Sequence, residues 1–201
     1  MYGRTDIDKY ASGAETIENF IVRPEGGLMR RHGTRFAGEV KDHLKKTRLI
    51  PFVFSTVQAY MLEFGHTYLR VWRDYAPVTT ATKTVTAISQ TNPAVVTAMG
   101  HGFTNGDRVV ITGVAGMGEV NNREFVVKNV NAGANTFELY ETDGTTPVAS
   151  TNYTTYSSGG TVGEILQVTT AFTESELPDV RITQSADTLY IFHPDHPPQK
   201  L

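Results

Sequence analysis

The 201-residue sequence contains no cysteine. This absence excludes disulfides, thiolate zinc sites and cysteine nucleophiles, and it says nothing about cellular compartment. No run approaches the roughly 20 apolar residues of a membrane-spanning helix. The segment MYGRTDIDKY is polar where a signal peptide would have an apolar core. We therefore expect a soluble protein with no membrane segment and no export signal.

Motifs of catalysis are also missing. The sequence has no GxSxG nucleophile elbow and no GxxxxGK phosphate loop, and its carboxylates are too scattered to suggest an acid/base pair. Gly100, Gly102 and Gly106 approach a dinucleotide-binding fingerprint. A strand pattern follows them, where that motif needs a helix, so these glycines favour turns. We expect no enzymatic activity and no cofactor.

One group of residues has the chemistry of metal ligands. His193, Asp195 and His196 form the segment HPDH, which could supply nitrogen and oxygen ligands to zinc. A proline-containing loop does not make these side chains converge, and structural zinc sites usually have four ligands. The sequence shows no second cluster to complete a set. We therefore predict no metal site.

Positive charge is concentrated in the first third of an acidic chain. The formal net charge is -3, and 12 of the 18 lysines and arginines lie in residues 1–76. Arg30, Arg31 and Arg35 are candidates for contact with another subunit or with DNA phosphates. The alternative is a solvated or ion-paired face. In a strand, Arg30 and Arg31 would point to opposite faces, so one patch would hold only one of them.

Apolar spacing predicts the local structure of the first part. Residues Ile7, Tyr10, Ala14, Ile17 and Ile21 recur at three- and four-residue intervals, which favours an amphipathic helix. The PEGG segment that follows favours a turn, because proline fixes its own φ and glycine accepts positive φ.

Strands are expected on both sides of a central segment. Residues 48–54, 59–64 and 67–73 read as strands, and Gly65-His66 suits a type II′ hairpin loop. In the last of these strands Tyr68, Arg70 and Trp72 alternate with Leu69, Val71 and Arg73.

The tail offers weaker signals. Thr173 and Glu176 form a capping box for a very short helix, and residues 187–193 read as a strand. The final residues 194–201 are proline-rich and are expected to be extended as polyproline. An apolar strand so near the last residue suggests a fragment of a longer protein.

The middle of the chain is rich in Thr, Val, Gly and Asn. Short β-branched runs separated by glycine and asparagine turns predict a small antiparallel barrel. The runs cover residues 84–89, 94–99, 107–114, 123–130, 135–141 and 160–165. The predicted fold is mainly β: a discontinuous β-rich domain with one or two short helices, formed by 1–76 and 167–201, plus an inserted small antiparallel β-barrel at 77–166.

Three motifs occur in a fixed order in the flanking regions. They are YGRTDIDKYASGAETIENFIVRPEGGLMRRHGTRFAGEV, RLIPFVFSTVQAYMLEFGHTYLRVWRD and ELPDVRITQSADTLYIFHPDHPPQKL. This order resembles the N-terminal region of tail nozzle proteins, also called tail tubular protein B, of short-tailed bacteriophages and prophages. The resemblance covers about 1–76 and 167–201. It implies a virion protein made in the bacterial cytoplasm, which assembles as a ring, hexameric in full-length form, around the DNA exit channel.

The same resemblance implies a set of partners. These are copies of the chain itself, the portal and adaptor, other tail proteins, and DNA in non-specific contact within a channel. It carries over no catalytic residue.

The inserted segment resembles a different family. GHGFTNGDRVVITGV, GEVNNREFVV and NTFELYE are similar to the β module that forms the first catalytic cysteine half-domain of ubiquitin-activating enzymes. Without cysteine the chain cannot form the thioester of such an enzyme. The resemblance therefore implies a β-barrel and no ubiquitin chemistry.

An alternative function belongs to the barrel alone. Tyr153 and Tyr156, taken as exposed, could stack on sugars, so the module could recognise a host surface glycan or another tail protein. Tyrosines of a barrel core are the more common case.

Overall fold

The computed structural model describes residues 16–23, 27–34, 36–53 and 59–201. The fold is mainly β, as predicted, and among the described residues the only helices are two short 3-10 turns, η2 (Gly118–Val120) and η3 (Leu177–Asp179). No helix in these ranges is long and apolar enough to cross a membrane. The chain divides into two compact units, Met1–Phe36 and Ala37–Leu201.

The first unit contains a small hairpin. Strands β1 (Phe20–Val22) and β2 (Leu28–Arg30) pair antiparallel, with Val22 opposite Leu28. This pairing confirms a chain reversal across the PEGG segment. The helix expected up to Ile21 is wrong at its end, because residues 16–19 are not helical and Phe20–Val22 is a strand; its part before residue 16 lies outside the described residues. Ile21 and Val22 are β-branched, and backbone pairing across the turn overrides the helical spacing.

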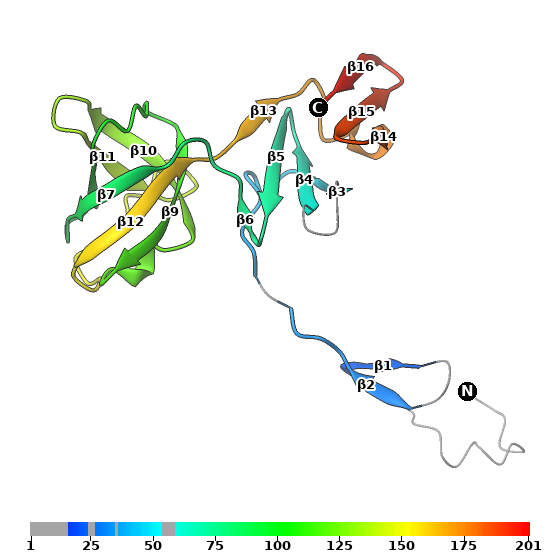
Figure 1. Ribbon diagram of the computed structural model, residues 1–201, viewed down its shortest axis with the longest axis horizontal. Helices are drawn as coiled ribbons and strands as arrows, with labels where there is room; N and C mark the ends of the chain where they lie inside the picture. The colour runs from blue at the N-terminus through cyan, green and yellow to red at the C-terminus, as the bar shows by residue number, and fades with distance from the viewer. Residues whose placement is uncertain (1–15, 24–26, 35, 54–58) are drawn as a thin grey trace, which may run out of the picture. The chain divides into compact units, whose positions relative to one another are not determined.

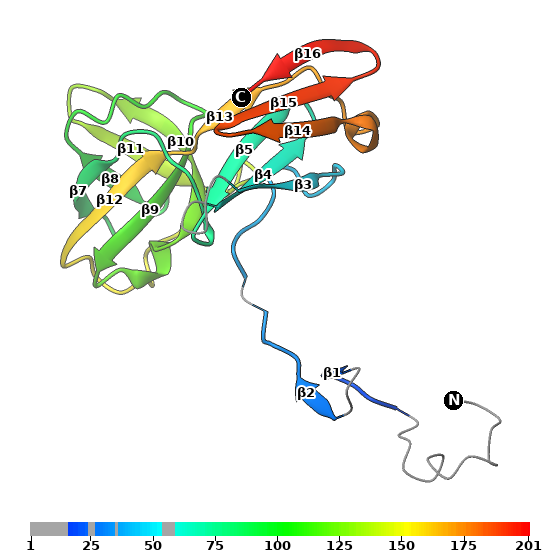
Figure 2. The same ribbon diagram turned by 45° about the vertical axis from the view of Figure 1, so that its right-hand side comes forward.

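The second unit contains a sheet that unites both sides of the barrel segment (Figures 1 and 2). Its strand order is β13-β5-β4-β3, and β6 pairs with β5. The strands are β3 (Arg48–Val53), β4 (Ala59–Gly65), β5 (Tyr68–Arg73), β6 (Ala76–Pro77) and β13 (Gln167–Thr169). The predicted strands at 48–54, 59–64 and 67–73 are thus confirmed within the described residues.

The loop between β4 and β5 differs from the predicted one. Gly65 pairs with Tyr68, so the loop is His66-Thr67, and the positive φ falls on Thr67 at 63°. A type II′ turn needs positive φ at its first central residue, so that prediction is wrong. The reason is a close approach: a Cβ at Gly65 would overlap the Tyr68 ring, which keeps the glycine in the strand.

A second sheet completes the flanking region. Its strands, in order, are β14 (Arg181–Ser185), β15 (Thr188–His193) and β16 (His196–Lys200). The predicted polyproline tail is therefore a strand. It tolerates its two adjacent prolines because β16 is an edge strand and its pairing with β15 shifts register between Ile191 and His193, opposite the prolines.

Only one half of the predicted capping box is present, and its helix begins later than expected. The Glu176 N–H donates to the Thr173 carbonyl, not to the Thr173 hydroxyl. The Thr173 N–H donates to Glu176 Oε2 at 2.7 Å, and the Thr173 hydroxyl donates to the same oxygen at 2.6 Å. The 3-10 turn η3 starts at Leu177, so Glu176 itself flanks it.

The two sheets share a hydrophobic core. Buried side chains come from β3, β4 and β5 and from the segments after β13. These residues are Ile50, Leu62, Phe64, Leu69, Phe172, Leu177, Val180, Leu189 and Ile191. Because both flanks contribute, neither can bury its apolar face without the other.

The middle segment forms a closed antiparallel barrel with strand order β10-β11-β8-β7-β12-β9, and its six strands are labelled in Figure 2. The strands are β7 (Lys83–Ile88), β8 (Val95–Ala98), β9 (Arg108–Ala115), β10 (Arg123–Asn131), β11 (Thr136–Tyr140) and β12 (Ser158–Glu164). Every run predicted from the sequence overlaps one of these strands. Gly100, Gly102 and Gly106 all have positive φ and lie between β8 and β9, which confirms turns. Closure removes the exposed sheet edges that would invite aggregation.

The barrel interior contains one buried histidine. His101 is 6% exposed, its Nδ1 accepts the Phe103 N–H at 3.0 Å, and its ring lies against those of Phe103 and Phe137. Its Nε2 has no partner in the described part of the chain. Burial lowers the pKa of His101, because the imidazolium loses its hydration.

This burial predicts a pH dependence of stability. Above pH ~6.5 the imidazole is neutral in both states, whereas below that pH the unfolded chain binds the proton first. We expect the free energy of unfolding to fall from pH 7 to pH 5 by up to about 1.4 kcal/mol per pH unit from this group. Urea titrations at several pH values measure the slope. His101→Asn, whose Oδ1 can still accept the Phe103 N–H, should flatten it, and the exposed control His32→Asn should not. Equal slopes in all three proteins would contradict the assignment.

Candidate functional site

The face of the main sheet opposite its core has two chemically different ends. Strand alternation places Leu69 and Val71 toward the core and Tyr68, Arg70 and Trp72 on the other face, as the sequence predicts. The register continues this face across the sheet, since Glu63 lies opposite Arg70 and Met61 opposite Trp72. One end of the face is therefore apolar and the other is charged.

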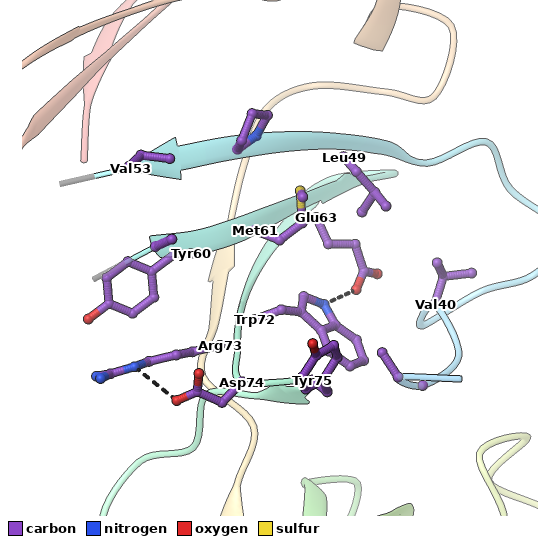
Figure 3. Close-up of a pocket in the computed structure, with 14 residues that line it drawn as sticks. Val40, Leu49, Val53, Tyr60, Met61, Glu63, Trp72, Arg73, Asp74 and Tyr75 are labelled. Atoms are coloured by element: carbon purple, nitrogen blue, oxygen red, sulfur yellow. Dashed lines mark hydrogen bonds and ion pairs between the residues drawn. The ribbon is translucent and has the colours of Figure 1, made fainter. Parts of the chain in front are cut away.

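The apolar end forms a groove with a volume of about 430 Å³ (Figure 3). Its walls come from β3, β4, β5 and the segment before β3. They are Ala37, Gly38, Val40, Leu49, Pro51, Val53, Ala59, Tyr60, Met61, Glu63, Trp72, Arg73, Asp74 and Tyr75. Apolar side chains remain exposed here: Leu49 is 58% exposed, Val53 53% and Met61 38%. A volume and lining of this kind suit an apolar side chain or small apolar ligand.

A buried carboxylate forms the inner end of the groove. Glu63 is fully buried, and it accepts hydrogen bonds from the Tyr68 hydroxyl at 2.6 Å and from Trp72 Nε1 at 2.6 Å. Figure 3 shows the Trp72 indole directed toward this carboxylate. Burial, and then the hydrogen bond to Glu63, raise the pKa of Tyr68, so its hydroxyl stays protonated as a donor. The indole is thereby held as a fixed wall of the groove.

The segment before β3 packs onto the same indole. Gly38 has no side chain, and a Cβ there would lie 2.6 Å from the Trp72 ring. The Lys41 N–H donates to Glu63 Oε1 at 3.4 Å, and Lys41 Nζ lies 5.1 Å from the centre of the Tyr68 ring. The segment thus closes one side of the groove through contacts with three residues of the sheet.

The turn at the rim of the groove is strained. Asp74 and Tyr75 join β5 to β6, and both have positive φ, 51° and 69°. This is the pattern of a type I′ turn, which asparagine and glycine usually occupy. A tyrosine in this conformation costs roughly 1 kcal/mol, and the turn keeps Tyr75 61% exposed beside the groove.

The charged end of the face meets the barrel through an ion network. Arg70 has no exposed surface and donates both terminal nitrogens to the Glu124 carboxylate, each at 3.1 Å. Arg108 donates to the same carboxylate at 2.6 Å. Glu124 and Arg108 belong to barrel strands, so the network joins sheet and barrel. Its bidentate geometry fixes orientation as well as distance.

The surroundings of this network lower the pKa of a nearby lysine, Lys41. The pKa of Lys41 is lowered by its burial and then by the positive charges of Arg70 and Arg108, while Glu124 and Glu63 oppose the shift. Positive charge is therefore concentrated at this end of the face, beside carboxylates that balance it.

Two of the three arginines predicted from the sequence as contact residues lie in described parts of the first unit. Arg30 ends β2 and Arg31 follows it, both in the first unit and both exposed, and the Arg31 N–H donates to the Asn19 carbonyl at 2.9 Å. Arg35 lies outside the described residues. Their contact with a subunit or DNA stays a prediction.

The barrel tyrosines are not exposed platforms. Tyr153 and Tyr156 are partly buried and pack against the barrel core. The Tyr153 hydroxyl accepts a hydrogen bond from Arg123 at 3.0 Å, and the Tyr156 hydroxyl lies 3.0 Å from the carbonyls of Val85 and Gly159. The assumption of exposed rings for sugar stacking is therefore wrong, because both rings help to fill the barrel.

Neither the groove nor the ion network could be predicted from the sequence, for a physical reason. Alternation in β5 indicated that Arg70 and Trp72 share a face, but nothing local pairs Arg70 with Glu124, 54 residues away. The groove needs the register of three strands. A buried position for Arg70 could have been suspected only from its place among apolar neighbours in TYLRVWR.

One known protein family has a sequence model that matches part of the chain, and the match lies in the barrel. Residues 91–165 match the family model of the ubiquitin-activating enzyme E1 FCCH domain, which agrees with the resemblance drawn from the sequence. No curated protein matches the chain. The matched range runs from just before β8 through β12, so the similarity covers five of the six barrel strands and leaves out β7.

Proposed function

We propose that the chain is a structural subunit of a bacteriophage or prophage tail, part of a nozzle that assembles as a ring around the DNA exit channel. The main structural support for a role in assembly is the open apolar groove on the main sheet. The three ordered motifs of the flanking regions support the nozzle identity, and in this proposal the barrel is an accessory module on the ring.

The groove has the properties of a subunit contact. Leu49, Val53 and Met61 expose apolar surface on one rigid sheet, and Tyr75 adds an aromatic side chain at its rim. Contiguous apolar surface of this kind marks interaction sites in soluble proteins. Aromatic residues beside apolar pockets supply much of the affinity of protein interfaces.

The chemistry of the groove favours a head-to-tail contact. A concave apolar site is not complementary to itself, so it must receive a different surface of the next copy. Contacts between two different surfaces produce closed rings when the rotation per subunit divides the circle. The occupant that we propose is therefore a second copy of the chain.

A charge placed in the groove tests this role. Leu49→Lys should weaken self-association about 30- to 150-fold, because a lysine replaces about 2–3 kcal/mol of apolar contact. Light scattering coupled to size-exclusion chromatography, over a range of protein concentrations, measures the mass of the assembly. Negative-stain electron microscopy then shows whether the assembly is a ring.

The barrel provides a matched control. Met99→Lys makes the same change from apolar to charged at a residue 77% exposed, outside the groove, and should leave the assembly unchanged. A wild-type chain that stays monomeric at the highest concentrations would overturn the proposal. So would an assembly that Leu49→Lys leaves intact.

A further inference from the structure

Three side chains with metal-binding chemistry converge in the C-terminal sheet region. Glu176 flanks η3, His193 ends β15 and His196 begins β16. Each offers one ligand atom, and these atoms all lie within 4.8 Å of one another. Asp195, the third residue of the HPDH segment, is not in the cluster, and Glu176 from a distant part of the sequence takes its place.

The fold explains the convergence. His193 and His196 are paired across the β15–β16 turn, so both rings lie at the same end of the hairpin. Their ring centres are 5.0 Å apart, and both rings contact Phe172 of the core. The Glu176 carboxylate is held from the other side, since Thr173 donates twice to Oε2. Oε1 is left to face His196 Nε2 at 3.1 Å.

One ring nitrogen of the cluster, His193 Nε2, makes no hydrogen bond within the described residues. His193 is 8% exposed, and its Nδ1 accepts the Asp195 N–H at 3.1 Å. Its Nε2 is buried and has no hydrogen-bond partner among the residues that the structure describes. Buried polar atoms in proteins are nearly always satisfied by protein, water or an ion.

We propose that Glu176, His193 and His196 bind a divalent transition-metal ion, with zinc as the preferred metal. Two imidazoles and one carboxylate are a ligand set that zinc accepts, with a water molecule in the fourth position. With bonds of ~2.0–2.1 Å, two ligand atoms of a tetrahedral site lie roughly 3.3 Å apart. The separation of 3.1 Å between Glu176 and His196 already matches this spacing.

Binding requires two small adjustments. The ligand atoms, up to 4.8 Å apart, must close by roughly 1.5 Å, which side-chain rotation can supply. If His193 binds through Nε2, its proton moves to Nδ1 and the contact with the Asp195 N–H is given up. Glu176 and His196 are half-buried, with side chains 28% and 21% exposed, so an ion can enter from solvent.

The ionic state of the cluster favours a cation. The pKa of Glu176 is lowered to about 2 by the two hydrogen bonds from Thr173 and by His196. The carboxylate is therefore ionised at neutral pH and can act as a negatively charged ligand. A bound zinc ion would replace the proton between Glu176 and His196.

Metal titration of the full chain, without a histidine tag, tests the proposal. Zinc chloride is added in competition with a chromogenic chelator at pH 7.5, and we expect one zinc ion per chain. His196→Ala and Glu176→Gln should each weaken binding at least 10- to 100-fold, because each removes one of three protein ligands. His43→Ala, at an exposed histidine outside the cluster, should bind zinc as the wild type does.

Cobalt supplies a readout of geometry. Co²⁺ bound in a tetrahedral site absorbs visible light far more strongly than in an octahedral site, so the wild type should show an intense band that His196→Ala lacks. Circular dichroism confirms that each variant is folded. His193 is not substituted, because its ring packs against Phe172 of the core and its loss could unfold the protein. Failure of the wild type to bind zinc at 1 mM, or unchanged binding in both cluster variants, would overturn the proposal. Neither result bears on assembly through the groove.

Discussion

Arg70→Met should lower the free energy of unfolding by about 3–5 kcal/mol, the usual cost of removing one partner from a buried ion pair. Arg70 is fully buried and donates twice to Glu124, and its Nε also donates to Gln167 at 3.3 Å. Methionine can fill the space of the arginine stem but leaves the 12% exposed Glu124 side chain with Arg108 as its remaining charged partner. Urea unfolding followed by circular dichroism measures the loss.

A neighbouring arginine is the control. Arg73 lies on the same strand, but its side chain is 43% exposed and pairs at 3.4 Å with Asp74, which is 88% exposed. Exposed pairs of this kind contribute about 0–1 kcal/mol, so Arg73→Met should have little effect. A loss in Arg70→Met no larger than in Arg73→Met would show that the network does not stabilise the fold.

A double variant separates pairing from packing. If the Arg70 and Glu124 side chains act together, Arg70→Met combined with Glu124→Gln should cost less than the sum of the two single changes. Additive losses would instead assign the effect of Arg70 to its packing against Tyr68, whose ring centre lies 5.6 Å from the guanidinium carbon. The structure favours coupling, because two hydrogen bonds join the pair.

The strands were the predictable part of the fold. Alternation in TYLRVWR assigned Leu69 and Val71 to one face and Tyr68, Arg70 and Trp72 to the other, and packing in the structure follows that division, since Leu69 and Val71 join the shared core. Glycine and asparagine turns likewise separated the barrel strands. These signals are local, since side-chain direction in a strand depends only on position.

Interactions between distant segments were not predictable in this way. Glu176 lies 20 residues from His196 in the sequence, yet its Oε1 contacts His196 Nε2. Its other carboxylate oxygen, Oε2, is held by a hydrogen bond from the Thr173 hydroxyl. The helix expected up to Ile21 failed because its spacing competed with pairing between β1 and β2. In each case the deciding contact is made by residues that the sequence pattern does not bring together.

Glu63 supports the groove, and its removal should have the second large effect. Glu63→Ala leaves the Tyr68 hydroxyl and Trp72 Nε1 without their acceptor, and both bonds are 2.6 Å long. Unsatisfied buried donors cost about 1–3 kcal/mol each, so we expect a loss of about 3 kcal/mol in the free energy of unfolding. Urea unfolding measures it.

The conservative variant should cost much less. In Glu63→Gln the amide oxygen can still accept the Trp72 N–H, and the amide nitrogen can donate to the Tyr68 hydroxyl, which is able to accept as well as donate. The same exchange is impossible at Trp72, because an indole nitrogen is only a donor. Glutamine therefore has one orientation that satisfies both side chains, although the Lys41 N–H, 3.4 Å from Oε1, loses its acceptor. We expect the cost of glutamine to lie clearly below that of alanine.

Trp72 also reports on the groove directly. It is the single tryptophan of the chain, so tryptophan fluorescence, excited selectively over tyrosine, comes from the wall of the groove itself. Glu63→Ala should shift the emission maximum in the folded state and weaken self-association, because the indole loses its anchor. Glu39→Gln, at an exposed glutamate, should change neither quantity. A Glu63→Ala protein with wild-type emission and stability would mean that packing against Gly38 holds the indole without the carboxylate.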